Sequence, residues 1–527
     1  MTNQSFAPPS QATFVARKTP RFTVEQRQKI LEQTDYNVFN FPASMINVDL
    51  LTDSGTCAPY QSSMAALALG DESYARNNGY YVFLDALRDF TQRGDKPQKR
   101  YLSLFEGAWN FNQIEEMFTA DEEERGFVNG GVAQLEHPNV YILPQGRCCE
   151  VILFSALSKY WKDQPDRVVV SNGFFDTTRA NAKIADFEAV DFFRKDVFDD
   201  FPIEKVGLEN PFKGDLDVVA LKDYLKSNSH RVSLVVMTLT NNTISGMPVS
   251  MKNVKEVRQI CDEYSIPLHV DGARIVDNAA FIKKFEDGYQ DFSIPEILRQ
   301  LFDLCDSFHI SLKKALCNIG GVMCIKHEGN FIKKYPGINH EMKKEQIITM
   351  GNDSYGAVSG RELAACTIGL YQVVQEDYIF PRIEQTEYLA VELAKKGIPV
   401  VLPPGSHAVY LNVNKMFPER SWEDFMGIGL VSELLKQYGI RGCELGYACW
   451  ELDVYYEKNG KLPEVMPPNL VRFAIPANVY SKEHMDYVVK CLDAVNQNKD
   501  NISAFEVGRG KYVDLRHFVV QYKPKNK

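Results

Sequence analysis

Two short apolar runs near the middle of the chain each end in a polar residue that could take part in chemistry. Asp271 ends the run IPLHVD, and Ser311 ends DSFHIS shortly before a pair of lysines, Lys313 and Lys314. Such runs are typical of buried strands, and parallel sheets bind ligands at the carboxyl ends of their strands. The carboxylate could bind the ring nitrogen of a heteroaromatic molecule, and the amine could react with a carbonyl carbon of the same molecule.

A third group could bind an anion. Gln145, Gly146 and Arg147 precede the helical run CCEVILFSALSKYW, so that free backbone N–H groups would face a negative charge. A carboxylate, a lysine and a phosphate-binding helix N-terminus are together what a pyridoxal phosphate site requires. The residues therefore predict an enzyme that uses this cofactor, with the lysine bound to it as a Schiff base.

The elements that must position these groups follow from the alternation between residues 168 and 325. Apolar β-branched runs such as VSLVVMTL (232–239) are separated there by segments with helical spacing. This predicts an α/β fold with a large, mostly parallel sheet covered on both faces. From about residue 380 the pattern predicts a smaller α+β domain. Thr23 and Gln26 fit a capping box, which predicts that a helix begins there.

Composition excludes several other classes of protein. The chain has 527 residues and a formal net charge of −10, which argues against nucleic acid as a partner. No run approaches the roughly 18 apolar residues of a membrane span, so no membrane partner is expected. Eleven cysteines without a CxxC pair, and a polar start without the apolar core of a secretory signal, predict reduced thiols and a cytoplasmic location.

Nine short stretches carry a resemblance to a known family. In chain order they are LLTDSGT (50–56), GDESYA (70–75), PQGR (144–147), FFDTTR (174–179), NNTISGMPVS (241–250), VDGARIVDNAAFIK (270–283), SLKKALCNIGG (311–321), VRFAIP (471–476) and LRHF (515–518). With these stretches the chain resembles the β-eliminating lyases, the tryptophanase and tyrosine phenol-lyase group of fold-type-I pyridoxal phosphate enzymes. The resemblance covers nearly the whole chain apart from an insertion at about 90–137.

The resemblance implies an architecture and an assembly. Residues 1–60 would form an N-terminal arm and part of a small domain, 61–375 the large cofactor-binding domain, and 376–527 the C-terminal small domain. The family's active sites take residues from two subunits, which implies a homodimer or homotetramer. The implied reaction is β-elimination on an L-amino acid, a small-molecule substrate, through an aminoacrylate that hydrolyses to pyruvate and ammonia.

The resemblance leaves two alternatives for the lysine that binds the cofactor, Lys314 and Lys313. The family spaces this lysine one residue further from Asn-Ile-Gly-Gly than Lys314 stands here. Counting forward from Ser311 selects Lys314, whereas counting back from Gly320 selects Lys313. We prefer Lys314, because a one-residue loss is easiest in the loop after the pair.

The remaining site residues are carried over by position. Those implied to bind the cofactor are Gln145, Gly146, Arg147 and Ser311 at the phosphate, Phe175 on the ring face, Asp271 at the ring nitrogen, and Asn242 and Arg274 at the 3′-oxygen. Arg472 would clamp the substrate carboxylate in a bidentate fork, helped by Thr52 and Ser54.

Two further implied sites lie between subunits. Tyr74 matches the family's general acid, which reaches into the active site of a neighbouring subunit. Gly55, Glu72 and Asn318 match a site for a monovalent cation, normally potassium, built from oxygen ligands.

Three positions bear on the leaving group. Asp176 and His517 match tryptophanase, where an acid and a histidine lie near the indole. Leu445 stands where the phenol-lyases place an arginine that binds the substrate, and an apolar side chain cannot hold a phenolate. The chain therefore resembles tryptophanase more than tyrosine phenol-lyase at these positions.

Some departures from the family pattern keep alternatives open. Ala315, Met247 and Ala477 replace family residues near the expected substrate side chain. The stretch HVDGAR (269–274) also resembles the signature of threonine aldolases, which makes an aldolase-like lyase the alternative enzyme. A non-catalytic regulator that binds pyridoxal phosphate is the alternative of a different class.

Overall fold

The computed structural model describes residues 18–93, 139–314, 316 and 318–525. The predicted insertion at 90–137 therefore lies outside the described residues from residue 94 onward. Residues 89–93 continue helix α3 (Asn78–Arg88) as a short π-helical segment.

A seven-stranded sheet forms the larger part of the molecule, with the strand order β2-β8-β7-β6-β5-β3-β4. Its strands are β2 (Val140–Leu143), β3 (Val168–Ser171), β4 (Glu188–Asp191), β5 (Val232–Thr238), β6 (Leu268–Asp271), β7 (Ser307–Ser311) and β8 (Gly321–Ile325). All run parallel except β8, which is antiparallel to both of its neighbours. The sheet confirms the predicted mostly parallel α/β fold.

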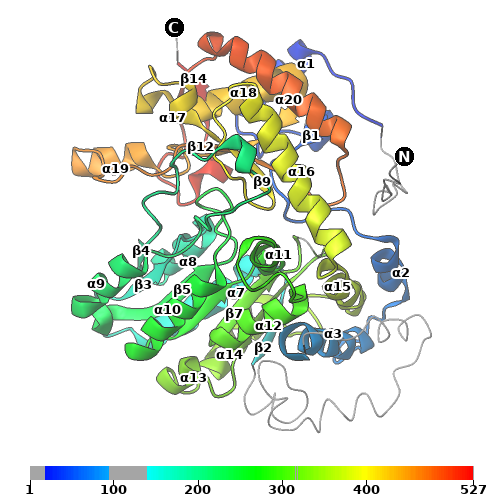
Figure 1. Ribbon diagram of the computed structural model, residues 1–527, viewed down its shortest axis with the longest axis vertical. Helices are drawn as coiled ribbons and strands as arrows, with labels where there is room; N and C mark the ends of the chain where they lie inside the picture. Colours follow the sequence, from blue (N-terminus) through cyan, green and yellow to red (C-terminus); the bar gives the residue numbers. More distant parts are fainter. Residues whose placement is uncertain (1–17, 94–138, 315, 317, 526–527) are drawn as a thin grey trace.

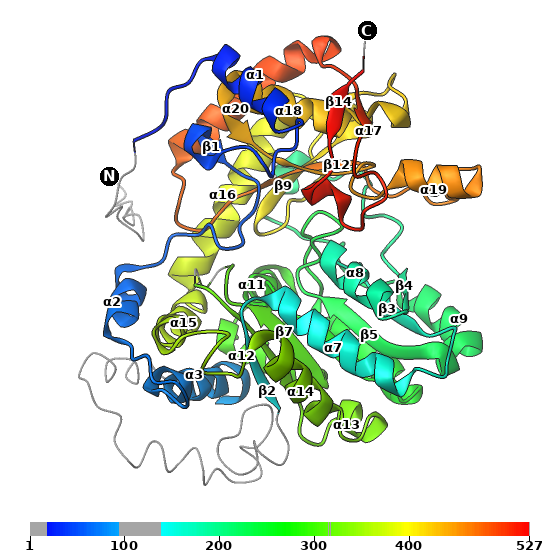
Figure 2. The same cartoon turned by 180° about the vertical axis from the view of Figure 1, so that it is seen from behind.

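Helices cover both faces of this sheet (Figures 1 and 2). One face packs on α3, α9 (Val218–Asn228), α10 (Met251–Glu263), α11 (Ile275–Phe285), α12 (Ile294–Leu304) and α15 (Gly360–Val373). The other packs on α7 (Gly146–Tyr160), α8 (Asp176–Ile184), α13 (Asn330–Lys334) and α14 (Ile338–Met350). Val168 and Val170 face the first set of helices and Val169 the second, as the alternation of a strand requires.

A second, smaller core surrounds an antiparallel sheet of three strands. These are β9 (Ala408–Asn412), β11 (Cys443–Leu445) and β12 (Leu470–Ala474), with β12 in the middle. Helices α1 (Val24–Gln33), α16 (Glu376–Lys395), α18 (Met426–Tyr438) and α20 (Lys482–Gln497) pack around this core. Figure 1 shows α16 running from this core toward the larger sheet.

The N-terminal residues belong to this second core. Helix α1 begins after the capping box of Thr23 and Gln26, as predicted, and packs on α18. Strand β1 (Val48–Asp49) pairs in parallel with β10 (Ile440–Arg441). The domain boundaries proposed at residues 60 and 375 stay predictions.

The other elements are short. They are α2 (Gln61–Leu69), α17 (Val413–Met416), α19 (Leu452–Asn459) and the strand pair β13 (Phe505–Val507) and β14 (Tyr522–Pro524). Between β13 and β14 the chain forms a 3₁₀ turn, η8 (Arg516–Phe518). Among the described residues, no helix combines the length and the apolar composition needed to cross a membrane.

Candidate active site

Asp271 ends β6 at the carboxyl edge of the sheet and is buried. Its Oδ1 accepts a hydrogen bond from the backbone N–H of Ala273 at 3.1 Å and lies 3.2 Å from Nε2 of His309. Burial alone would raise the pKa of Asp271, but the positive charge and hydrogen bond of His309 outweigh it and hold this pKa well below its usual value. Asp271 is therefore a carboxylate at every physiological pH.

The two lysines after β7 lie in different surroundings. Lys314 is half-buried, and desolvation of its amine, followed by the nearby charge of Arg274, lowers its pKa to about 8; Asp271 opposes this shift. Lys313 is half-buried, and its Nζ lies 3.5 Å from Oε1 of Gln145. Burial and the charge of Arg147 lower the pKa of Lys313. The structure thus brings Lys314 into the electrostatic field of Asp271 and Lys313 next to Gln145.

The N-terminus of α7 lies against the end of β7. The helix begins at Gly146, and a Cβ atom added there would lie only 3.2 Å from Cβ of Ser311. Gln145 forms a β-bridge with Gly320, which follows the lysine pair. Gln145, Gly146 and Ser311 therefore lie together, with N–H groups of the first helical turn available to an anion, while Arg147 is exposed.

Arg274 is part of a buried ion-pair network that sequence reasoning missed. Its Nε and Nη2 donate to the two oxygens of Asp53 at 3.0 and 2.7 Å. Arg382 on α16 also donates to Asp53, at 2.9 Å, and pairs with Asp277 at 3.1 Å. Asp53 stands between Thr52 and Ser54 in the stretch LLTDSGT, so the network ties both cores to the expected substrate site.

Arg472 lies on β12 and faces the larger sheet. Its Nη1 donates to Oδ1 of Asn242 at 3.3 Å and its Nη2 to the backbone oxygen of Leu51 at 3.0 Å. The Oδ1 atom of Asn242 also accepts a hydrogen bond from the Tyr410 hydroxyl. Nε of Arg472 is buried without a hydrogen-bond partner among the described residues. A buried guanidinium with an unused donor is suited to bind a carboxylate.

Asp176 and His517 form a pair at the start of α8. Oδ2 of Asp176 lies 3.2 Å from Nε2 of His517 on η8. Burial alone would raise the pKa of Asp176, but the hydrogen bond and charge of His517 outweigh it, so this pKa is lowered. On the other side of the ring, Sγ of Cys449 lies 3.7 Å from Nδ1. Phe175, the residue before α8, is half-buried.

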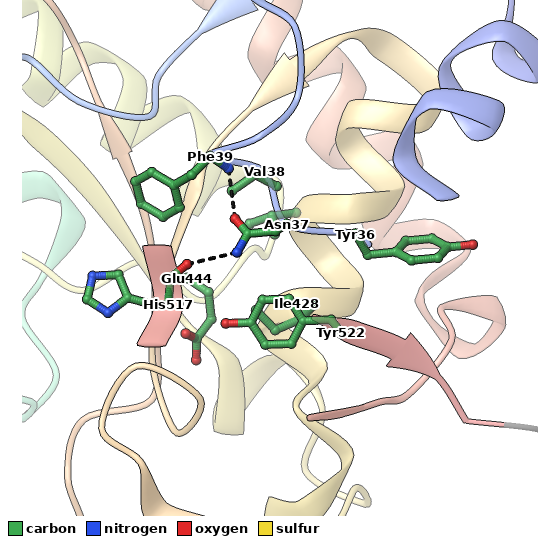
Figure 3. Close-up of a pocket in the computed structure, with 9 residues that line it drawn as sticks. Tyr36, Asn37, Val38, Phe39, Ile428, Glu444, His517 and Tyr522 are labelled. Atoms are coloured by element: carbon green, nitrogen blue, oxygen red, sulfur yellow. Dashed lines mark hydrogen bonds between the residues drawn. The ribbon is translucent and has the colours of Figure 1, made fainter. Parts of the chain in front are cut away.

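The backbone of His517 is fixed by the N-terminal part of the chain. Nδ2 of Asn37 donates to the backbone oxygen of His517 at 3.2 Å. Figure 3 shows His517 lining a small pocket together with Asn37, Glu444 and Tyr522. Burial raises the pKa of Glu444 to about 7, although the backbone N–H groups of Ala448 and Cys449 donate to it.

Tyr74 is a surface residue within one chain. Its side chain is 74% exposed, and its ring stacks on that of Tyr355 at a centroid distance of 4.2 Å. The burial of Asp271, which is 4% exposed, contrasts with this exposure. A single chain therefore does not enclose Tyr74 in the site.

The three residues implied for a cation have separate partners. Glu72 forms an ion pair with Arg361. Nδ2 of Asn318 donates to backbone oxygens at 2.8 and 3.1 Å, and the N–H of Gly55 donates to the backbone oxygen of Lys313. None of these contacts among the described residues joins one of the three to another, and the cation site stays a prediction.

Sequence reasoning also missed two buried histidines. His309 contacts Asp271, and His269 contacts His309. The sequence could have indicated them, because residues two apart in a strand face the same side of the sheet. His269 stands two residues before Asp271, and His309 two residues before Ser311.

Comparison with known proteins gives the family. Residues 49–491 match the sequence model of the β-eliminating lyases. The chain is 33% identical to a tryptophanase of Salinibacter ruber over 507 residues, covering 95% of this chain and 92% of the relative. It is 34% identical over 504 residues to a probable β-eliminating lyase of Trichomonas vaginalis (95% and 94%), and 30% identical over 508 residues to a tyrosine phenol-lyase of Symbiobacterium (95% of each).

Solved structures agree on the fold. An aspartate aminotransferase of Thermotoga maritima matches with a TM-score of 0.52 at 11% identity, over 90% of this chain and 95% of that one. A serine palmitoyltransferase of Sphingomonas wittichii matches with a TM-score of 0.52 at 12% identity, over 91% and 97%. These likenesses confirm the expected fold-type-I architecture.

Fold and sequence together define a class, the pyridoxal phosphate-dependent lyases. The groups at the sheet edge fit this cofactor: Asp271 keeps Oδ2 free of hydrogen bonds among the described residues, and Lys314 is a half-buried amine with a lowered pKa. The chain belongs to the β-eliminating lyase family. This result confirms the predicted enzyme class, a pyridoxal phosphate-dependent lyase.

Proposed function

We propose that the protein catalyses β-elimination on an L-amino acid with an aromatic heterocycle on Cβ, in the manner of a tryptophanase, with pyruvate and ammonia as products. The observation that carries this proposal is the pair of Asp176 and His517, 3.2 Å apart and close enough to Arg472 for its charge to act on Asp176. A carboxylate–imidazole pair can hold and protonate a ring N–H or ring carbon as the ring departs. Leu445 on β11 supports the choice, because it offers no charge to a phenolate.

The cofactor-binding residues follow from the cluster at the sheet edge. When bound, the cofactor supplies an electron-withdrawing ring that makes the substrate's α-proton removable. Asp271 holds the ring nitrogen protonated, and Lys314 attaches the cofactor and later takes the α-proton on Nζ. Its pKa of about 8 supports this role, since a near-neutral amine is an effective base. The residues proposed around the rest of the cofactor are Gln145, Gly146, Arg147 and Ser311 at the phosphate, Phe175 on the ring face, and Asn242 and Arg274 at the ring oxygen.

Arg472 orients the substrate. Its guanidinium binds the α-carboxylate with help from Thr52 and Ser54, which flank the buried Asp53. This contact fixes the amino acid so that the Cα–H bond faces Lys314 and the side chain faces Asp176 and His517.

The assembly is proposed to be a homodimer or homotetramer with shared sites. Tyr74 supports this arrangement, because a catalytic tyrosine that is 74% exposed needs a second chain to bury it. Met64 and Leu69 on α2 expose apolar side chains shortly before Tyr74 in the sequence, which suits a contact between copies. Potassium at Gly55, Glu72 and Asn318, and a cytoplasmic location, stay predictions of the same kind.

A substrate panel tests the reaction. Purified enzyme with pyridoxal phosphate is given L-tryptophan, L-tyrosine, an S-alkyl-L-cysteine or L-threonine, with and without potassium, and pyruvate is measured. We expect pyruvate with equimolar indole from tryptophan and little from tyrosine. Phenol and pyruvate from tyrosine, or glycine and acetaldehyde from threonine, would contradict the proposal.

A further inference from the structure

Four buried side chains form a row behind the carboxylate at the end of β6. Nε2 of His309 lies 3.2 Å from Oδ1 of Asp271, and Nδ1 of His309 lies 2.9 Å from Nε2 of His269. Nδ1 of His269 lies 2.8 Å from the hydroxyl of Ser307. The two imidazole rings stack with centroids 5.2 Å apart and planes 22° apart. All four residues are at most 4% exposed.

The register of two neighbouring strands builds this row. In the parallel pair of β6 and β7, Asp271 lies opposite His309 and His269 opposite Ser307. Residues two apart in a strand share a face, so all four side chains project to the same side of the sheet. The row is therefore a property of the rigid core of the fold.

The pKa values of the two histidines shift in opposite directions, which indicates which ring carries the extra proton. Burial alone would lower the pKa of His309, but Asp271 and Glu150 outweigh burial and the charge of Lys314, so this pKa is raised. Burial and the charge of His309 hold the pKa of His269 far below its usual value. The raised pKa of His309 favours its protonated form, which donates to Asp271 and to His269, and the neutral His269 then donates its Nδ1–H to Ser307.

The same contacts argue against a metal ion at this place. Ligand atoms of Glu150, Asp271 and His309 lie within 4.8 Å of one another. Both nitrogens of His309 already have partners, however, and the oxygens of Glu150 accept hydrogen bonds from Thr178 and Asn181 at 2.6 and 3.1 Å. Glu150 contributes to raising the pKa of His309, while burial and the charge of Asp271 raise the pKa of Glu150 itself.

The carboxylate of Asp271 is held asymmetrically as a result. Its Oδ1 is shared by His309 and the N–H of Ala273, whereas Oδ2 has no hydrogen bond among the described residues. One oxygen is therefore anchored in the protein and the other is free for a ligand.

We propose that His309 and His269 are positioning residues that keep Asp271 ionised and aim its free oxygen at the ring nitrogen of the cofactor. The inference rests on the proposed role of Asp271. His309 supplies a fixed positive charge and a donor, and His269, anchored on Ser307, sets the orientation and tautomer of His309. Neither residue touches the substrate.

Binding of pyridoxal phosphate to the apoprotein, followed by its visible absorbance from pH 6 to 9, tests this inference. His309→Leu removes the imidazole donor and its charge. We expect the Kd of this variant for the cofactor to rise about 10- to 100-fold, because one hydrogen bond to a charged group is lost. The visible absorbance of the cofactor bound to His309→Leu should also change between pH 6 and 9, whereas that of the cofactor bound to the wild type should stay constant. His309→Gln keeps a neutral donor near the Nε2 position and should restore most of the affinity but not the constant absorbance.

Two control variants separate the possible failures. Phe308→Leu alters a buried neighbour on β7 that faces the opposite side of the sheet, and it should bind the cofactor as the wild type does.

Asp271→Asn tests the role on which the inference rests. If Asp271→Asn weakens binding and His309→Leu leaves Kd and absorbance unchanged, the inference is wrong and the role of Asp271 stands. If Asp271→Asn also binds normally, the role of Asp271 is wrong. Equal losses in His309→Gln, His309→Leu and Phe308→Leu would mean that packing alone is at work, which would overturn the inference.

Discussion

Nε2 of His517 lies 3.2 Å from Oδ2 of Asp176, so a turn near the C-terminus meets the first residue of α8 on the larger sheet. The pair connects the two cores of the molecule beside Arg472. A substrate bound there would have its carboxylate held by one core and its leaving group contacted by both.

This pair leads to a prediction that depends on the leaving group. Asp176→Asn and His517→Phe should lower kcat/KM for tryptophan about 10²- to 10⁴-fold, the usual contribution of general acid catalysis. β-Chloroalanine loses chloride without a proton, so its elimination should change by less than about tenfold. Pyruvate release from both substrates measures the difference. Equal losses for both would show that the variants damage the site as a whole.

The two neighbouring lysines should behave differently. Lys314→Ala should abolish covalent attachment of the cofactor, because the amine in the electrostatic field of Asp271 is lost. Lys313→Ala should retain attachment and only weaken binding, since Lys313 lies next to Gln145 at the expected phosphate site. Borohydride reduction followed by peptide mass analysis locates the attached lysine. Label on Lys313 in the wild type would reverse the assignment.

Lys314 should also make stability depend on pH. Burial and Arg274 lower its pKa to about 8, below the value near 10.4 of an exposed lysine. Below pH 8 the folded apoprotein therefore carries an unfavourable charge, with a cost of about 3 kcal/mol that disappears as the pH rises towards 10.4. Lys314→Met should raise the free energy of unfolding at pH 7 and have less effect at pH 10. Denaturant unfolding of apoprotein at both pH values measures this, and a gain that is independent of pH would contradict it.

Arg472 should govern substrate binding. Arg472→Ala removes the proposed fork and leaves Oδ1 of Asn242 with one donor fewer, so kcat/KM for tryptophan should fall about 100-fold or more. Arg472→Lys keeps the charge but not the bidentate geometry, and its loss should be intermediate. Steady-state kinetics give both values, and the Kd of the cofactor shows separately how far the lost contact with Asn242 affects cofactor binding. An unaltered kcat/KM in Arg472→Ala would remove Arg472 from the site.

Shared active sites can be tested by mixing subunits. Tyr74→Phe and Lys314→Ala should each have very low activity as pure proteins. If Tyr74 acts in the site of another chain, dissociating and reassociating an equal mixture of the variants should restore about a quarter of wild-type activity, because half of the catalytic pairs are then mixed and one of the two sites in each mixed pair carries both intact residues. Pyruvate release before and after mixing measures this. No recovery, with mixed oligomers demonstrated by mass, would place Tyr74 in the site of its own chain.

The sequence predicted those parts of the structure that depend on local pattern. The apolar runs ending at Asp271 and Ser311 are strands, because runs so rich in apolar residues are stable only inside a covered sheet. The helix start at Thr23 was equally accessible, since a capping box involves only neighbours. The antiparallel direction of β8 was not predicted, because it depends on the path of the loop after Lys314.

The parts of the site that were missed depend on contacts between distant residues. Asp53 and Arg382 meet across 329 positions of the chain, and neither has an unusual local sequence. Cys449 approaches His517 across 68 positions. Only the pairing of β6 with β7 brings His269 and His309 together, so their relation requires the register of the sheet.

The parallel pairing of β1 with β10 affects how the chain can fold during synthesis. Val48 leaves the ribosome early, yet its partner Ile440 follows only when most of the protein has been made. The larger sheet can form in the meantime, because all of its strands lie between residues 140 and 325. We therefore expect nascent chains to hold α1 and β1 unpaired until late in translation, a period in which their apolar side chains would be accessible to chaperones.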